Sequence, residues 1–192
     1  MYPNRNNKLE ILKLYTKDYK SQFYLREISR LSLLPVKNVQ NLLHSLEKSR
    51  ILKSRISGKN KYFHLNLNNI STKFLLLQAE IYKTLLFLES YPVFKTFLKM
   101  VSTHAPIIVF GSFAKFAAEK ESDLDLLAIQ EDDEKLPLYL LPYQIHEIRL
   151  SEKSFNKALE KQESLIKEIE ANHILLNNQS FYVETMWGMY GK

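Results

Sequence analysis

Two apolar strands joined by a Gly-Ser turn and a short helical stretch constrain this chain more than any other feature. The first strand, Ile107–Phe110, runs directly into Gly111 and Ser112, and the second carries Asp123 and Asp125. Side chains two positions apart on a strand share a face, so we expect both aspartates to point to the same side. Paired carboxylates on one side are the hard oxygen ligands that a divalent cation needs.

The composition is that of a globular protein with room for a sizeable core. The chain has 192 residues, 45% of them hydrophobic, which suits one large or two small domains. Cysteine is absent, which excludes disulfides, thiol catalysis and thiolate metal sites. The start of the chain lacks the apolar stretch of a signal peptide, and no apolar run is long enough to span a membrane. We therefore expect a cytoplasmic protein without a membrane partner.

Charge is distributed unevenly along the chain. Residues 1–70 hold 14 of the 27 Lys and Arg residues but 4 of the 21 Asp and Glu residues, a net charge of +10. Residues 71–192 carry the remaining charges, with a net of −4. Such an asymmetry indicates a basic module that meets a polyanion, joined to a module with another task.

The basic part is predicted to consist of three helices and a hairpin. Apolar spacing predicts helices over 9–14 and 25–31 and a third helix that begins near Pro35. In the third helix a buried stripe of Val39, Leu42, Leu43 and Leu46 leaves a polar face exposed. Two short β-like runs, 51–56 and 61–67, flank a Gly/Asn turn and predict a β-hairpin.

This order of elements resembles a winged helix-turn-helix domain, and the resemblance rests on pattern rather than on a motif. It implies that the third helix enters the major groove of double-stranded DNA and that the hairpin contacts phosphates. Asn and Gln are suited to reading adenine, and Lys and Arg to binding phosphate. The alternative is a protein-binding module of the same fold. The predicted DNA-binding residues are Lys37, Asn38, Gln40, Asn41, Lys53, Arg55, Lys59 and Lys61.

A long apolar helix over 71–90 follows the basic part. It is hydrophobic around much of its circumference, so we expect burial on more than one side. It could serve as a linker, as the interface of a homodimer or as a core helix of the second domain. The predicted domains are 1–70, the winged helix; 71–91, the linker or interface helix; and 92–192.

The motif in the last domain resembles the signature of the polymerase-beta-like nucleotidyltransferase superfamily, especially its minimal members. The matching residues are Gly111-Ser112-Phe113-Ala114-Lys115, followed by Ser122-Asp123-Leu124-Asp125-Leu126-Leu127. The resemblance implies an α+β fold with a small mixed sheet, a short helix over 112–119 and C-terminal helices. It also implies transfer of a nucleoside monophosphate from a nucleoside triphosphate (NTP), with divalent metals held by three carboxylates.

Roles for the site residues follow from this resemblance and from their chemistry. Gly111 lets the backbone approach a phosphate, and Ser112 and Lys115 offer phosphate contacts. Asp123 and Asp125 would bind Mg²⁺ or Mn²⁺, with ATP as the expected nucleotide. The third carboxylate is expected from a strand over 143–150, where Glu147 is the acidic residue and is assigned to catalysis. His146 would lie on the opposite face of that strand and is interpreted as structural.

A departure from the family pattern falls just after Lys115, where relatives commonly have glycine and this chain has Phe116. We expect this residue to narrow or reshape the pocket.

The function predicted from the sequence is metal-dependent transfer of a nucleoside monophosphate to a hydroxyl acceptor by a DNA-binding protein. The alternative is a transcriptional regulator, or an antitoxin-like partner protein of a toxin–antitoxin pair, whose nucleotidyltransferase domain is a catalytically weak nucleotide sensor. A protein partner and homodimer formation are further expectations.

Overall fold

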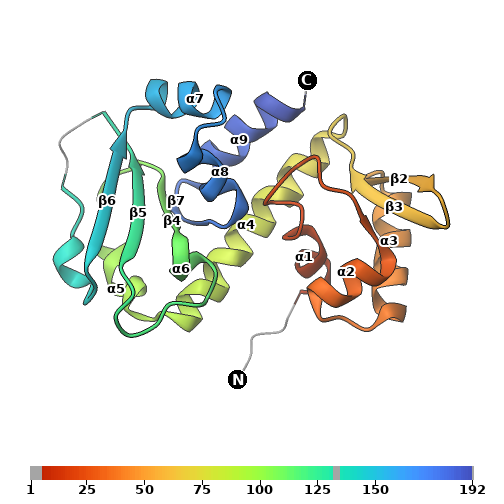
Figure 1. Cartoon of the computed structure of the whole chain (residues 1–192), viewed down its shortest axis with the longest axis horizontal. Helices are drawn as coiled ribbons and strands as arrows, with labels where there is room; N and C mark the ends of the chain where they lie inside the picture. The colour runs from red at the N-terminus through yellow and green to blue at the C-terminus, as the bar shows by residue number, and fades with distance from the viewer. Residues whose placement is uncertain (1–5, 132–134, 192) are drawn as a thin grey trace. The chain divides into compact units, whose positions relative to one another are not determined.

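A computed structural model describes residues 6–131 and 135–191 and divides them into two compact units (Figure 1). The first unit contains the described residues up to Ala79 together with those from Met186 onward. The second unit is Glu80–Thr185.

The first unit combines helices with a three-stranded antiparallel sheet in the order β1-β3-β2. Its β2–β3 hairpin pairs Ser57 with Asn60 next to the turn, as the sequence predicts. The elements are α1 (Asn7–Leu12), β1 (Phe23–Tyr24), α2 (Leu25–Ser32), α3 (Val36–Lys48), β2 (Leu52–Ser57) and β3 (Asn60–Leu65).

Apolar stripes on the helices form the core of the first unit. Helix α3 buries Val39, Leu43 and Leu46, while its predicted polar face is exposed. Tyr15 is fully buried beside this core, and its hydroxyl donates a hydrogen bond to the carbonyl of Phe63 at 3.1 Å. Burial, helped by the negative charge of Glu27, raises the pKa of Tyr15 far above its usual value.

Helix α4 (Ile70–Ser90) begins one residue before the predicted start. The side chain of Asn69 accepts a hydrogen bond from the Ser71 N–H at 3.0 Å, which satisfies a free donor of the first turn. The helix has both buried and exposed apolar residues. Its buried ones include Leu76, Ala79 and Phe87, and its exposed ones are Ile70, Phe74, Ile81 and Leu85. Among the helices of the described residues, none combines the length and apolarity needed to cross a membrane.

The second unit is built on a small mixed sheet in the order β6-β5-β4-β7, visible on the left of Figure 1. Strand β4 pairs antiparallel with β5 and β7, and β5 pairs parallel with β6. The predicted α+β class with a small mixed sheet and C-terminal helices is confirmed here. The strands are β4 (Ile107–Phe110), β5 (Leu124–Ile129), β6 (Ile145–Leu150) and β7 (Ile174–Asn177). The other elements are α5 (Val93–Met100), α6 (Gly111–Ala114), the 3₁₀ turn η1 (Leu138–Leu140), α7 (Glu152–Glu160), α8 (Ser164–Ala171) and the first part of α9 (Gln179–Tyr190), whose residues from Met186 onward belong to the first unit.

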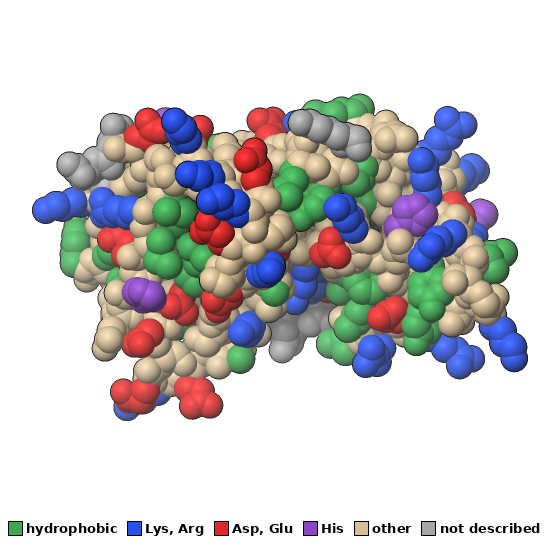
Figure 2. All heavy atoms as spheres, turned by 45° about the horizontal axis from the view of Figure 1, so that its top comes forward, with side chains coloured by type: hydrophobic (Ala, Val, Ile, Leu, Met, Phe, Trp, Pro, Cys, Tyr) green, Lys and Arg blue, Asp and Glu red, His purple; other side chains and the backbone are tan. Residues whose placement is uncertain are grey.

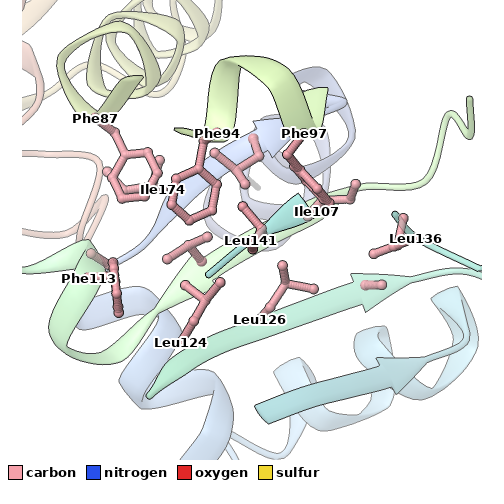
Figure 3. Packing of buried hydrophobic residues seen from close by; sticks show 14 residues of the cluster. Phe87, Phe94, Phe97, Ile107, Phe113, Leu124, Leu126, Leu136, Leu141 and Ile174 are labelled. Carbon is pink, nitrogen blue, oxygen red and sulfur yellow. The ribbon is translucent and has the colours of Figure 1, made fainter. Parts of the chain in front are cut away.

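One face of this sheet is packed by aromatic side chains from the helices that precede it. Phe87 of α4 and Phe94 and Phe97 of α5 are fully buried there (Figure 3). From the sheet, the same cluster contains Leu124 and Leu126 among others. This apolar face fixes the orientation of β5, because alternate residues of the strand must enter the cluster.

The short helix after β4 is shorter than the sequence predicts. We expected a helix over 112–119, but α6 ends at Ala114. The cause is the backbone of Phe116, whose φ of +56° is left-handed and cannot continue a right-handed helix.

Candidate functional site

Gly111 and Asp125 meet where β4 turns into α6. The antiparallel register places Phe110 opposite Asp125, so the turn at Gly111 lies against the aspartate side chain. Gly111 has a φ of +66°, and a Cβ added there would lie 2.1 Å from Asp125 Oδ2. Any side chain here would displace this carboxylate and would disfavour the left-handed backbone conformation.

The residues around this turn are accessible. Ser112 is half-buried in the first turn of α6, and Lys115 is exposed just after the helix. The Ser112 carbonyl accepts a hydrogen bond from the Ala117 N–H at 3.1 Å, which closes the loop after α6. Ser112 and Lys115 are thus both accessible from solvent on the same short segment.

Asp123 and Asp125 stand at the start of β5. Asp123 directly precedes the strand and is exposed, and the Asp125 side chain is 28% exposed. Leu124, between them, is fully buried in the aromatic-lined cluster. The period-two alternation that buries Leu124 therefore directs Asp125 to the other side of the sheet.

Glu147 does not join these aspartates, which corrects the third carboxylate expected from the sequence. The parallel register pairs Glu147 with Leu126, so its side chain lies on the face of the buried cluster. Ile145, two positions earlier, packs against that cluster. The Glu147 Oε1 atom instead accepts a hydrogen bond from Arg149 Nε at 2.8 Å.

His146 occupies the place next to Asp125. The register pairs the two residues, and His146 Nδ1 lies 3.4 Å from Asp125 Oδ1. The sequence correctly predicts that His146 and Glu147 point to opposite sides of the strand. It misses which of the two meets Asp125, because that depends on the register between two strands and no local signal reveals it.

The donors that the strand register brings together on this side of the sheet are one carboxylate, Asp125, and one imidazole, His146. Within residues 6–131 and 135–191, no three His, Asp or Glu side chains are already gathered closely enough to hold a metal ion. The Asp125–His146 pair can nevertheless offer one oxygen and one nitrogen to an ion.

An aromatic cluster borders the Gly111–Ser112 turn. Phe116 is 46% exposed and stacks on Tyr91, with ring centroids 6.3 Å apart and planes inclined by 25°. The Tyr91 ring also contacts the ring of Phe113. The Phe113 ring in turn contacts that of Tyr143, with ring centroids 4.7 Å apart. Burial and the neighbouring Tyr91 raise the pKa of Tyr143. The Phe116 ring thus covers part of the cluster next to the turn.

A basic groove lies in the first unit between α3, the start of α2 and the β2–β3 hairpin. It has a volume of about 530 Å³ and contains five of the predicted DNA-binding residues. Those five are Lys37, Gln40, Asn41, Lys59 and Lys61. Asn38, Lys53 and Arg55 are exposed but do not line this groove. In Figure 2, Lys and Arg side chains gather at the right-hand end, where Figure 1 places β2 and β3.

The groove also contains residues that the sequence did not single out for binding. Tyr24 lines it from β1, Arg26 from the start of α2 and Glu47 from α3. The Glu47 carboxylate pairs with Lys61 Nζ at 2.8 Å and accepts a short hydrogen bond from the Ser54 hydroxyl. These two hydrogen bonds, that of Lys61 first, lower the pKa of Glu47.

A second, smaller groove is lined by Lys53, which lies on the opposite face of the hairpin from Lys61. Its residues include Glu47, Arg50 and His64. Lys53 pairs in register with His64. Burial, together with the positive charges of Lys53 and Arg55, lowers the pKa of His64 and favours its neutral form.

Comparison with known proteins finds a family similarity within the second unit. Residues 93–179 match the family model of the nucleotidyltransferase domain. The matched segment contains the whole mixed sheet, the Gly111–Ser112 turn and both aspartates. This match supports nucleotidyl transfer as the general activity, and domains of this kind generally use an NTP and a divalent metal. No curated protein and no solved structure matches the chain.

Proposed function

We propose that the second unit binds an NTP at the Gly111–Ser112 turn and transfers its nucleoside monophosphate to a hydroxyl acceptor. The observation that carries this proposal is the approach of Gly111 to the Asp125 carboxylate, inside the segment that matches the nucleotidyltransferase family. A backbone without a side chain beside an acidic group is what a triphosphate and its counter-ion require.

Each residue of the turn has a task in this proposal. Ser112 and Lys115 contact the phosphates, and Asp123 and Asp125 hold a divalent ion. When bound, that ion neutralises charge on the phosphate oxygens. The acceptor oxygen forms a bond to the α-phosphorus, and the bond from this phosphorus to the bridging oxygen breaks. Pyrophosphate leaves, and the acceptor's proton passes to solvent. The chain contributes mainly by positioning and by electrostatic stabilisation.

The test is transfer of label from α-labelled ATP, GTP, CTP and UTP by the full chain, with Mg²⁺ or Mn²⁺. Loss of a carboxylate that holds the ion costs several kcal/mol, so we expect Asp125→Asn to reduce transfer at least about 100-fold. Glu147→Gln is the matched control, because it removes a carboxylate from the other face of the sheet. Equal activity in Asp125→Asn and wild type would overturn the proposal.

The alternative from the sequence, a catalytically weak nucleotide sensor, has one supporting observation. An imidazole, rather than a third carboxylate, stands beside Asp125. A sensor would bind NTP without transferring label, so an isothermal titration with each NTP in parallel with the transfer assay separates the two functions.

A second function is favoured by the basic groove. We propose that the first unit has the role of a winged helix and binds double-stranded DNA through α3 and the hairpin. Three lysines and three amide side chains line one groove, which suits phosphate binding together with base contact.

Salt dependence of binding tests this second function. We expect binding of a duplex to weaken steeply with salt, and each of Lys37→Gln and Lys59→Gln to reduce the log–log slope by about 1. Lys153→Gln is the control, because Lys153 is an exposed residue of α7 in the second unit. Binding that is insensitive to salt would contradict DNA recognition by this groove.

A further inference from the structure

The position beside Asp125 on the neighbouring strand is a histidine. Strands β5 and β6 run parallel and pair Asp125 with His146, so both side chains lie on the same side of the sheet. His146 Nδ1 and Asp125 Oδ1 are 3.4 Å apart. The His146 side chain is 70% exposed and is therefore accessible from solvent.

The spacing of these two atoms suits two ligands of one ion. Nitrogen and oxygen donors lie ~2.1 Å from a first-row divalent metal ion. Two such donors are ~3.0 Å apart when they subtend a right angle at the ion and ~3.4 Å apart at a tetrahedral angle. The observed separation falls at the upper end of this range, so the Asp125–His146 pair needs little rearrangement to bind an ion.

The type of donor sets which ion is preferred. Mg²⁺ takes oxygen ligands in a near-ideal octahedron, whereas imidazole nitrogen favours the transition metals. Exchange of a carboxylate for an imidazole also removes one negative charge from the site. This weakens the electrostatic attraction between the site and a cation, and most for a hard cation such as Mg²⁺. Glu147 cannot restore that charge, since it lies on the opposite face and is bound to Arg149.

We propose that Asp125 and His146 jointly ligate a divalent transition-metal ion, so that the site selects Mn²⁺ over Mg²⁺. The inference rests on the proposed nucleotidyl transfer by the second unit and specifies the metal class of that site. His146 is thereby a ligand-supplying residue that replaces an acidic one.

Metal binding is measured on the full chain without nucleotide, with Mn²⁺ as the probe. Pulsed electron paramagnetic resonance reports directly on a nitrogen ligand through its coupling to the Mn²⁺ electron spins. We expect this nitrogen coupling in wild type and in Glu147→Gln. In His146→Ala we expect the coupling to be lost and Mn²⁺ affinity to fall at least tenfold. His146 is exposed, so this variant should fold normally, and its thermal unfolding verifies that.

A reciprocal variant tests selectivity. We expect His146→Asp, which supplies a third carboxylate, to raise Mg²⁺ affinity at least tenfold relative to Mn²⁺. The inference is overturned if wild type shows no nitrogen coupling, or if His146→Ala binds Mn²⁺ as wild type does. It is also overturned if wild type binds Mg²⁺ as tightly as Mn²⁺. In each of these cases, continued transfer of label from NTP would leave the proposed function standing. Absence of label transfer with either ion would instead overturn that function.

Discussion

Glu80 Oε1 lies 2.9 Å from His173 Nε2, and both side chains are completely buried in the second unit. His173 Nδ1 lies 2.7 Å from the carbonyl oxygen of Ile169, and Lys83 Nζ lies 3.0 Å from His173 Nε2. Lys83 Nζ is 2.8 Å from the other carboxylate oxygen of Glu80. One buried carboxylate thus anchors α4 to the segment between α8 and β7.

The buried carboxylate should make the folded protein acid-sensitive. Burial by itself raises the pKa of Glu80, but the charges of His173 and Lys83 outweigh it and lower the pKa from 4.5 to about 2. A lowered pKa stabilises the fold above pH 4.5, and this stability is lost as the pH falls from 4.5 toward 2. We expect a loss on the order of 3 kcal/mol across that window, measured by urea unfolding.

Replacement of this carboxylate should separate its effect from other acid effects. Glu80→Gln leaves Lys83 and His173 buried without their anion, which costs about 3–5 kcal/mol near neutral pH. Its unfolding free energy should then depend less steeply on pH between 2 and 4.5 than that of wild type. Parallel pH profiles for the two proteins would contradict this assignment.

Gly111 and Gly58 provide a matched pair for testing the close approach at the site. Both have left-handed backbones, with φ of +66° and +59°, but a Cβ at Gly58 would meet nothing within 4 Å. Alanine at either position should cost about 1 kcal/mol of backbone strain. Gly111→Ala should in addition displace the Asp125 carboxylate and reduce nucleotide affinity at least tenfold, whereas Gly58→Ala should not. Isothermal titration measures the affinities, and equal values would refute the close approach.

Phe116 should tolerate replacement by glycine better than its size suggests. Its left-handed backbone costs about 1–2 kcal/mol, which glycine relieves. Two losses offset this gain: the stacking of the Phe116 ring on Tyr91, and the burial of about half of the Phe116 side chain. We expect Phe116→Gly to change the unfolding free energy by less than about 1 kcal/mol.

The neighbouring Phe113 gives the contrast for this prediction. Phe113 is fully buried, and Phe113→Ala should cost about 3–5 kcal/mol. Chemical denaturation measures both variants, and similar losses would show that Phe116 is held by packing rather than strained.

Glu47 should oppose DNA binding in the basic groove. Its carboxylate neutralises Lys61 and would face the phosphates of a bound duplex. Glu47→Gln should therefore tighten duplex binding, and most at low salt, where screening is weakest. Fluorescence anisotropy at two salt concentrations measures the affinity for the duplex. Glu168→Gln is the control, because Glu168 is an exposed residue of α8 in the second unit. Unchanged affinity would place the phosphates away from Glu47.

The sequence predicted those elements whose signals are local. The β2–β3 hairpin follows from two β-like runs around a turn, and α4 follows from a long apolar stretch ended at Tyr91-Pro92. The length of α6 was overestimated because Phe116 adopts a backbone conformation that its residue type disfavours. The winged-helix role, the cellular location and the homodimer stay predictions.

The amino-acid sequence alone determined the strand–turn–strand at Gly111, the alternation that separates Asp125 from Leu124 and Leu126, and the opposite facing of His146 and Glu147. These are properties of one continuous stretch of chain, which local residue preferences and fixed backbone periodicities dictate. Only the tertiary structure decided that His146, and not Glu147, stands beside Asp125, and that Glu80 meets His173. Both outcomes depend on how distant segments pack, because a shift of one residue in register would exchange the faces of β6.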